Sequence, residues 1–279
     1  MRLNRNRLLR ILAGPVVVYA LICLFMWAFQ RQLLYAPETD IQPPAAYGLR
    51  DFQDLRLRAS DGVRIQVWRH TANAGYPTIV YFHGNGGNLA GRAPYYQMLA
   101  DAGFGVLALS YRGYGNSEGS PSEQGFYRDA RATLKYASTQ LALQPRDIII
   151  YGESIGTGVA VQMATETPCA ALVLQSPYTS IDALARDHYP WLPVSLLLKD
   201  HFDSLSKISR IRAPLLVFHG DDDPVVPIRY GKAIFEKAPQ PKKSVYLPQT
   251  GHMDFDLAFL TDALVDFSVE QKIIAPPET

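Results

Sequence analysis

From about residue 51 onward, short apolar runs alternate with helix-like segments, and this alternation constrains the fold more than any other feature. Compact apolar runs, of the kind that lie buried between helices, occur at 78–82, 106–110, 148–151, 171–174, 215–218 and 244–247. Between and after them the sequence predicts helices near 88–101, 123–139, 155–166, 227–238 and 254–270. Repeated strand–helix units build a mostly parallel sheet flanked by helices. The predicted fold class is therefore α/β, with one domain at 51–270 and a tail at 271–279.

Two further segments complete the predicted domain. The segments 54–59 and 63–69 alternate apolar and polar residues around Ser60-Asp61-Gly62, which predicts an opening hairpin. Between 176 and 213 only about 38 residues are available over the sheet edge, which is enough for a short lid and too few for a separate cap domain. The uncharged part of this segment, 189–198, is its most apolar stretch.

The N-terminal segment has the pattern of a membrane anchor. An uncharged run at 11–29 follows four arginines, Arg2, Arg5, Arg7 and Arg10. As a helix this run spans roughly 28 Å, which is close to the hydrocarbon thickness of a bilayer. A cleaved signal peptide is the alternative, but its apolar region is normally shorter and no small-x-small cleavage site follows. The sequence predicts a basic segment at 1–10, a transmembrane signal anchor at 11–29 and a surface connector at 30–50.

The excess of arginine before the apolar run also predicts an orientation. Positive charge is retained on the cytoplasmic side of a membrane, so the N-terminus is expected there. The domain at 51–270 would then lie on the far side, which is the periplasm or another extracytoplasmic space if the chain is bacterial. The sequence predicts a single-pass membrane protein, and it does not predict an oligomeric state.

Composition argues against several classes of partner. The chain has 27 basic and 26 acidic residues and a net charge of +1, so no bulk field favours nucleic acid. Its two cysteines, Cys23 and Cys169, build neither a disulfide framework nor a cysteine-based metal site. The acidic run 221–223 lacks nearby cysteine or histidine ligand spacing. We therefore expect no nucleic-acid partner, no cofactor and no metal.

A nucleophile motif stands at the junction of a predicted strand and helix. Residues 152–156, Gly-Glu-Ser-Ile-Gly, match G-x-S-x-G, with an apolar strand before them and an apolar helix after them. In such an elbow the turn is so tight that the positions two before and two after the serine are glycine. Ser154 would be exposed at the carboxyl edge of the sheet, at a helix N-terminus that favours negative charge. The sequence predicts Ser154 as a nucleophile; the alternative is a capping serine in a plain turn.

Order along the chain selects the general base. Hydrolases built on this elbow present serine, acid and histidine in that order. Only His252 follows the acidic run 221–223, and it lies in a loop after the last predicted strand. We predict His252 as the base and one of the three aspartates at 221–223 as the acid, among which spacing alone does not choose. Asp254 is expected to cap the final helix.

Acyl transfer also needs two backbone N–H groups directed at the developing oxyanion. Ile155, directly after the serine, is expected to supply one of them. We expect the second from Asn85 in the glycine-rich loop 83–88, which matches neither of the common phosphate-binding glycine patterns. His83 precedes the serine and is expected to be a structural hydrogen-bonding residue.

Several of these motifs, taken together and in order, resemble one protein family. The residues that carry the resemblance are His83-Gly84-Asn85-Gly86-Gly87-Asn88, Tyr111 to Gly119, Gly152 to Gly156, His219-Gly220 with Asp223 and Val225-Val226-Pro227, and Gly251-His252. They resemble the serine aminopeptidase-like α/β-hydrolases, and within them the membrane-anchored branch that includes eukaryotic protein depalmitoylases. In that branch the acid stands three residues after the His-Gly pair, which implies Asp223. The cysteine cluster that is palmitoylated in some members is missing here, so depalmitoylation does not carry over automatically.

The motifs and the resemblance together predict a serine hydrolase. Ser154 would attack an ester or thioester carbonyl, His252 would move the proton and Asp223 would orient His252. We expect a small-molecule or lipid acyl substrate, bound in a groove between Asn85 and Trp191. A peptidase or amidase on the same residues is the alternative enzyme. A non-enzymatic, membrane-anchored interaction protein is the competing class.

Overall fold

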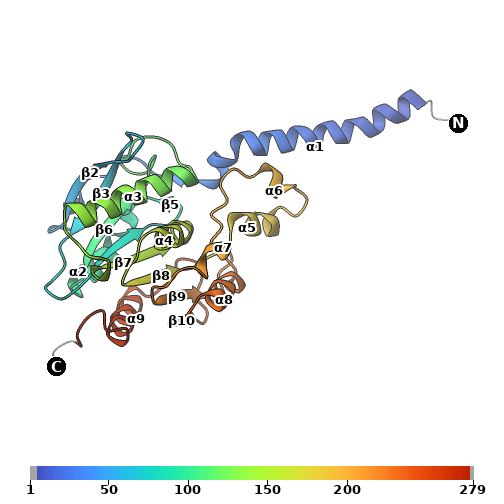
Figure 1. Ribbon diagram of the computed structural model, residues 1–279. Helices are drawn as coiled ribbons and strands as arrows, with labels where there is room; N and C mark the ends of the chain where they lie inside the picture. The colour runs from blue at the N-terminus through green and yellow to red at the C-terminus, as the bar shows by residue number, and fades with distance from the viewer. Residues whose placement is uncertain (1–4, 277–279) are drawn as a thin grey trace.

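An eight-stranded sheet forms the centre of the protein (Figure 1), whose computed structural model describes residues 5–276. Its order is β10-β9-β8-β7-β4-β6-β3-β2. The strands are β2 (Gln53–Arg58), β3 (Arg64–His70), β4 (Thr78–Phe82), β6 (Gly105–Ser110), β7 (Ile148–Glu153), β8 (Ala171–Gln175), β9 (Leu215–Gly220) and β10 (Lys242–Leu247). Residues 1–4 of the predicted basic segment and 277–279 of the predicted tail lie outside the described residues.

The strand directions agree with the sequence pattern. β2 pairs antiparallel with β3, and β3 pairs antiparallel with β6. Every other neighbouring pair in this sheet is parallel. The α/β fold class, the opening hairpin and the mostly parallel sheet are therefore confirmed. The central strands β4 and β7 are buried along their whole length, as expected for strands covered on both faces.

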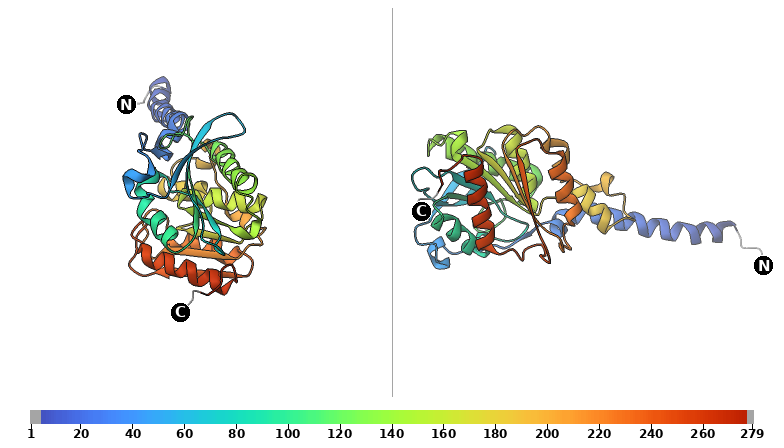
Figure 2. Two further views of the ribbon diagram at one scale, coloured as in Figure 1. Left: turned by 90° about the vertical axis from the view of Figure 1, so that its left-hand side faces the viewer. Right: turned by 90° about the horizontal axis from the view of Figure 1, so that it is seen from below.

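Helices cover both faces of the sheet (Figure 2). One face packs against α2 (Ala93–Asp101) and α9 (Leu257–Glu270), and the other against α3 (Glu123–Thr139), α4 (Ile155–Glu166) and α8 (Ile228–Lys237). The expected cap of the final helix is wrong by two residues. Asp256, not Asp254, accepts hydrogen bonds from the amides of Ala258 and Phe259, because the loop that carries His252 runs further before the helix begins.

A short lid connects β8 to β9. It contains α5 (Ile181–His188), α6 (Val194–Leu197) and α7 (Leu205–Ile208). Ser180 begins α5 by accepting a hydrogen bond from the amide of Ala183. The remaining short helices, η1 (Pro44–Tyr47), η2 (Leu89–Arg92) and η3 (Pro145–Asp147), lie in connections of the domain. The expected short lid is therefore present, without a separate cap domain among the described residues.

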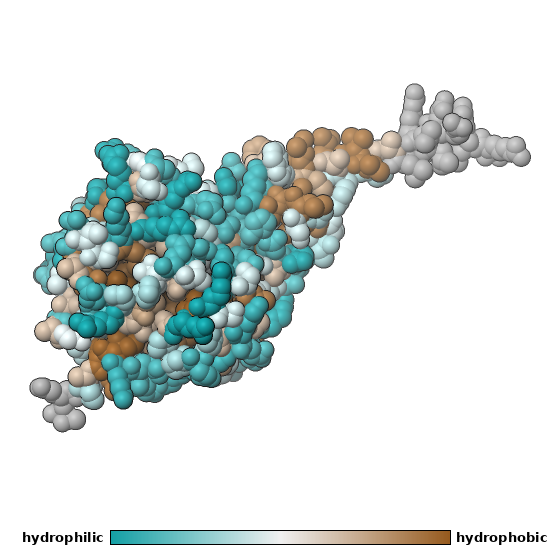
Figure 3. Space-filling model, viewed as in Figure 1, coloured by the Kyte–Doolittle hydropathy of each residue, from teal (hydrophilic) through white to brown (hydrophobic). Residues whose placement is uncertain are grey.

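A long apolar helix projects away from the domain. Helix α1 (Arg5–Leu34) is longer at both ends than the predicted span at 11–29. Within residues 13–34 the most apolar stretch of 18 residues has a mean hydropathy of 1.8 and is not buried in the domain, and apolar side chains gather along the projecting helix (Figure 3). The helix is long and apolar enough to cross a membrane, and a signal sequence would have the same properties.

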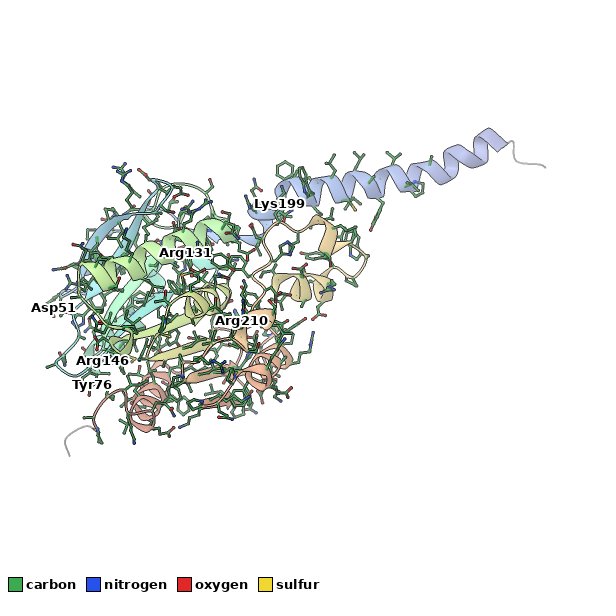
Figure 4. The ribbon with its side chains drawn as sticks, viewed as in Figure 1. Asp51, Tyr76, Arg131, Arg146, Lys199 and Arg210 are labelled. Atoms are coloured by element: carbon green, nitrogen blue, oxygen red, sulfur yellow. The ribbon has the colours of Figure 1, made fainter. Side chains whose placement is uncertain are left out.

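The lid packs against the domain end of this helix. Gln30 Nε2 donates to the carbonyl of Leu197 at 2.9 Å. The ammonium of Lys199 lies 3.9 Å from the centre of the Trp27 ring, at the junction where Figure 4 labels Lys199. An attraction between a cation and an aromatic face adds to the hydrogen bond. The lid and α1 are therefore joined by specific contacts.

The predicted surface connector at 30–50 is instead partly built into the domain. Tyr35, Ile41 and Leu49 are buried. The short strand β1 (Ala36–Pro37) pairs in parallel with β5 (Gly86–Gly87). The prolines and small residues of the segment 30–50 disfavour a long helix or a central strand. They do not prevent a two-residue pairing with a glycine-rich loop.

Candidate active site

The candidate site lies where the order of the strands reverses. β4 is flanked by β6 on one side and by β7 on the other. The connection after β4 runs to α2 on one face of the sheet, whereas the connection after β7 runs to α4 on the other face. Their diverging loops leave a crevice at the carboxyl ends of the strands. This topology brings the loop 83–88 next to Ser154.

Ser154 occupies a strained turn between β7 and α4. Its φ is +51° and its ψ is −118°, a conformation that side-chain-bearing residues rarely adopt. A Cβ at Gly152 would lie 2.5 Å from the carbonyl oxygen of Gly156, and a Cβ at Gly156 would lie 2.1 Å from that of Phe82. Both glycines are therefore required by the space around the turn, as the G-x-S-x-G pattern predicts.

Ser154, His252 and Asp223 form a continuous hydrogen-bonded chain. His252 Nε2 lies 2.8 Å from Ser154 Oγ, and His252 Nδ1 lies 2.7 Å from Asp223 Oδ2. The second carboxylate oxygen of Asp223 accepts hydrogen bonds from the amides of Val225 and Val226 at 2.9 and 2.8 Å. The three predicted residues come from loops after β7, β9 and β10, and the fold brings them together.

The protonation of Asp223 determines the role that His252 can take. Burial alone would raise the pKa of this carboxyl, but the His219 imidazole at 3.6 Å and the hydrogen bonds from His252 and the Val226 amide hold the pKa well below its usual range. An ionised carboxylate only accepts hydrogen bonds, so the network assigns the proton of His252 to Nδ1. Nε2 is then free to accept the proton of the Ser154 hydroxyl.

The other two aspartates of the acidic run do not contact His252. Asp221 is exposed and accepts a hydrogen bond from the amide of Gln249 at 2.7 Å. Asp222 is exposed as well, whereas Asp223 is buried. Spacing in the sequence did not distinguish the three aspartates. The aspartate that contacts His252 is Asp223, which is the one that the family resemblance implied.

The backbone N–H groups of the two predicted oxyanion donors have no partner in the described part of the protein. Within residues 5–276 neither the Asn85 N–H nor the Ile155 N–H donates to another protein atom. The side chain of Asn85 is fully engaged: Nδ2 donates to the carbonyl of Leu34 at 2.6 Å, and Oδ1 accepts from the hydroxyl of Tyr114 at 3.0 Å. The Asn85 backbone amide is thus free for a ligand while its side chain anchors the loop.

An open pocket of about 440 Å³ surrounds the serine. Its lining is Gly84, Asn85, Gly86, Gly91, Arg92, Glu153, Ser154, Val225, His252 and Met253. Trp191, which we expected to form the far wall, does not line it. The Trp191 carbonyl instead accepts a hydrogen bond from the hydroxyl of Tyr19 at 2.8 Å, because this part of the lid packs along α1. The expected groove between Asn85 and Trp191 is therefore wrong.

A buried ion pair beside the serine was not predicted. Glu153 is 2% exposed and accepts hydrogen bonds from Arg92 Nη2 at 2.8 Å and from the Tyr81 hydroxyl at 2.7 Å. Burial opposes ionisation of Glu153, but the charge and hydrogen bonds of Arg92 hold its pKa below the usual value. The only signal in the sequence was a charged residue, Glu153, at the end of an apolar strand. Nothing in the sequence identified Arg92 as its partner 61 positions away.

Two buried histidines near the site have structural roles. His83 Nδ1 donates to the carbonyl of Gly84 at 2.7 Å, and burial together with the charge of Arg92 lowers the His83 pKa to about 3. His83 is therefore neutral, as the structural role predicted for it requires. His219 Nε2 contacts the carbonyl of Val226 at 2.7 Å and supports the loop that carries Asp223. In the described part of the chain no three His, Cys, Asp or Glu side chains are grouped to hold a metal.

Comparison with known proteins identifies the family. A family model described as the alpha/beta hydrolase fold matches residues 77–196. An uncharacterized protein of Mycobacterium tuberculosis is 37% identical over 98% of this chain and 99% of its own length. The human alpha/beta hydrolase domain-containing protein 17B is 34% identical over 72% of this chain and 69% of its own length. The chain belongs to the α/β-hydrolase family.

One of its sequence relatives is a lipase, and one of the solved structures with a similar fold is an esterase. The lysophosphatidylserine lipase ABHD12 of Danio rerio is 32% identical over 73% of this chain and 63% of its own length. Among solved structures, the esterase Pf2001 of Pyrococcus furiosus superposes with a TM-score of 0.69 at 18% identity, covering 85% of this chain and 98% of that one. The structural match supports the fold alone, and the sequence relatives support a hydrolase.

Proposed function

We propose that the protein is a serine hydrolase that cleaves carboxylic esters or thioesters through an acyl-enzyme. The observation that carries this proposal is the chain from Ser154 Oγ through His252 to Asp223, with contacts of 2.8 and 2.7 Å, built on a strained elbow at the edge of the sheet. A capping serine in a plain turn would need neither the histidine nor the positive φ. Nucleophile, base and orienting carboxylate in this geometry suit acyl transfer.

In the proposed mechanism Ser154 Oγ attacks the acyl carbonyl carbon and gives its proton to His252 Nε2. The negative charge that develops on the carbonyl oxygen is stabilised by the amides of Asn85 and Ile155. His252 then protonates the departing alcohol or thiol, which leaves the acyl group on Ser154. Water, deprotonated by His252, attacks this ester, and His252 returns the proton to Ser154 Oγ as the carboxylic acid leaves. Asp223 stays ionised and stabilises the imidazolium in both halves of the reaction.

The pocket favours an acyl ester over a peptide. Val225 and Met253 are half exposed beside the serine and offer apolar contact to an acyl chain. The charged residues of the pocket, Arg92 and Glu153, neutralise each other, so neither is free to bind a peptide terminus. Each buried methylene contributes about 0.8 kcal/mol, so a short-to-medium acyl chain should improve kcat/KM until the pocket ends. The substrate is a small-molecule or lipid ester.

The experiment is labelling and turnover by the intact protein. A fluorophosphonate should label the wild type and not Ser154→Ala, and ester turnover should fall on the order of 10⁶-fold in that variant. Esters from acetyl to decanoyl are compared with an aminoacyl p-nitroanilide. Unchanged turnover by Ser154→Ala contradicts the mechanism, and a clear preference for the anilide favours a peptidase instead.

We also propose that residues 11–29 anchor the protein with its N-terminus in the cytoplasm. The support is the long apolar stretch of helix α1, which projects from the domain and follows the arginine-rich start of the chain. The protein should then stay in the membrane fraction after alkaline carbonate extraction. A reporter that is active only outside the cytoplasm, fused after Thr279, should give signal. A silent reporter in cells that export it normally contradicts the proposed orientation.

A further inference from the structure

The polypeptide that leaves helix α1 lies directly against the loop that carries the proposed oxyanion donor. We name residues 34–38 the exit segment and residues 83–88 the oxyanion loop. Asn85 Nδ2 donates to the carbonyl of Leu34 at 2.6 Å, and the amide of Glu38 donates to the carbonyl of Gly87 at 3.1 Å. Between these contacts β1 and β5 pair in parallel register. The oxyanion loop is therefore hydrogen-bonded along its length to the exit segment.

The opposite side of the oxyanion loop is held from the nucleophile elbow. Arg92 Nη1 donates to the carbonyl of Gly86 at 2.6 Å, and Arg92 Nη2 pairs with Glu153, the residue before Ser154. Gly86 and Gly87 have no side chains to pack, and Gly87 has a φ of +79°. A loop of this kind has little conformational preference of its own. Its position is set by the groups that hold it, which include Arg92, Tyr114 and the exit segment.

The exit segment is itself firmly fixed. Before it, Arg31 makes two hydrogen bonds to the buried carboxylate of Asp200, at 2.7 and 2.9 Å. Within it, the ring of Tyr35 is buried with its centre 5.2 Å from that of Phe126. At its end, the carbonyl of Glu38 accepts a hydrogen bond from the amide of Gly115 at 2.8 Å. The exit segment can therefore act as a rigid support and not merely as a tether.

We infer that the exit segment is a positioning element for the oxyanion loop, so that hydrolysis at Ser154 depends on how the N-terminal helix joins the domain. This inference rests on the proposed function, because it requires that the Asn85 amide stabilise the oxyanion. The exit segment does not touch the substrate. It acts by keeping the Asn85 amide directed at the same point as the Ile155 amide.

A single hydrogen bond tests the inference in the full-length protein. Glu38→Pro removes the N–H that donates to Gly87, whereas Glu38→Ala changes the side chain and keeps that N–H. Misplacing a catalytic group by about 1 Å can cost on the order of 10² in rate, so kcat of Glu38→Pro should fall about 10- to 100-fold. KM should stay within about twofold, since ground-state contacts remain. Glu38→Ala should keep the wild-type kcat.

A second readout separates positioning from general loss of structure. The phosphoryl oxygen of a fluorophosphonate takes the place of the oxyanion, so the labelling rate of Glu38→Pro should fall in parallel with kcat. Melting temperatures of the two Glu38 variants identify any loss of folding. A second pair of variants avoids proline: Asn85→Ala removes the contacts to Leu34 and Tyr114, and Tyr114→Phe removes only the latter. Asn85→Ala should lower kcat more than Tyr114→Phe does.

The outcomes separate this inference from the proposed function. The inference is overturned if folded Glu38→Pro keeps the wild-type kcat and labelling rate. It is also overturned if Asn85→Ala and Tyr114→Phe have equal kcat. In both cases turnover still requires Ser154, so the proposed function stands. If Glu38→Pro does not fold, the Asn85 and Tyr114 pair decides. Turnover that survives Ser154→Ala overturns the proposed function instead, whatever the Glu38 variants show.

Discussion

Replacing Asp223 by asparagine should abolish most turnover while leaving the fold intact. The carboxylate lies 2.7 Å from His252 Nδ1, and its side chain is fully buried. With an effective dielectric constant of about 20, an imidazolium and a carboxylate at that distance attract each other by roughly 6 kcal/mol. Because His252 is partly open to water, this is an upper value. Each 1.36 kcal/mol is a factor of ten in rate, so kcat should fall about 10³- to 10⁴-fold.

The assay is steady-state turnover of a short-chain ester, with Asp221→Asn and Asp222→Asn as matched controls. Both control carboxylates are exposed, and neither contacts His252, so their kcat should stay within about twofold of the wild type on the scale of ordinary surface substitutions. Unfolding in urea shows whether each variant is folded. A control variant that loses more activity than Asp223→Asn, or a folded Asp223→Asn with near-wild-type kcat, would refute the assignment of the acid.

Two further predictions concern stability. Gly156→Ala places a Cβ 2.1 Å from the Phe82 carbonyl oxygen, and overpacking of about 3 kcal/mol should lower Tm by about 6–12 °C; an unchanged thermal transition contradicts this reading of the elbow. Hydrogen bonds from Arg112 lower the pKa of Asp61 to about 2, below the unfolded value of about 3.9. The resulting stability is present above pH 4 and is lost as pH falls toward 2. The free energy of unfolding in urea at pH 7 should therefore be lower for Asp61→Asn than for the wild type. A difference that does not shrink at pH 2–3 argues against a stabilising ion pair between Asp61 and Arg112.

The sequence alone predicted those features that depend mainly on neighbouring residues or on their order along the chain. Strand–helix alternation predicted the parallel sheet because strands covered on both faces must be apolar throughout. The glycines at 152 and 156 predicted the elbow because no side chain fits there. The order of Ser154 and His252 along the chain predicted their meeting because successive parallel strands end at one edge of the sheet. For the acid, spacing left three aspartates open, and only the family resemblance selected Asp223.

Tertiary structure alone decided which distant segments meet. Arg92 and Glu153 are far apart in the sequence, and no periodicity predicts that they form a buried pair. The segment 30–50 has the composition of a surface connector, yet Tyr35 is buried and β1 pairs with the oxyanion loop. Trp191 lies against α1 and not over the serine, because the direction of a short lid depends on its docking partner. Propensity acts over a few residues, whereas such contacts depend on how the whole chain folds.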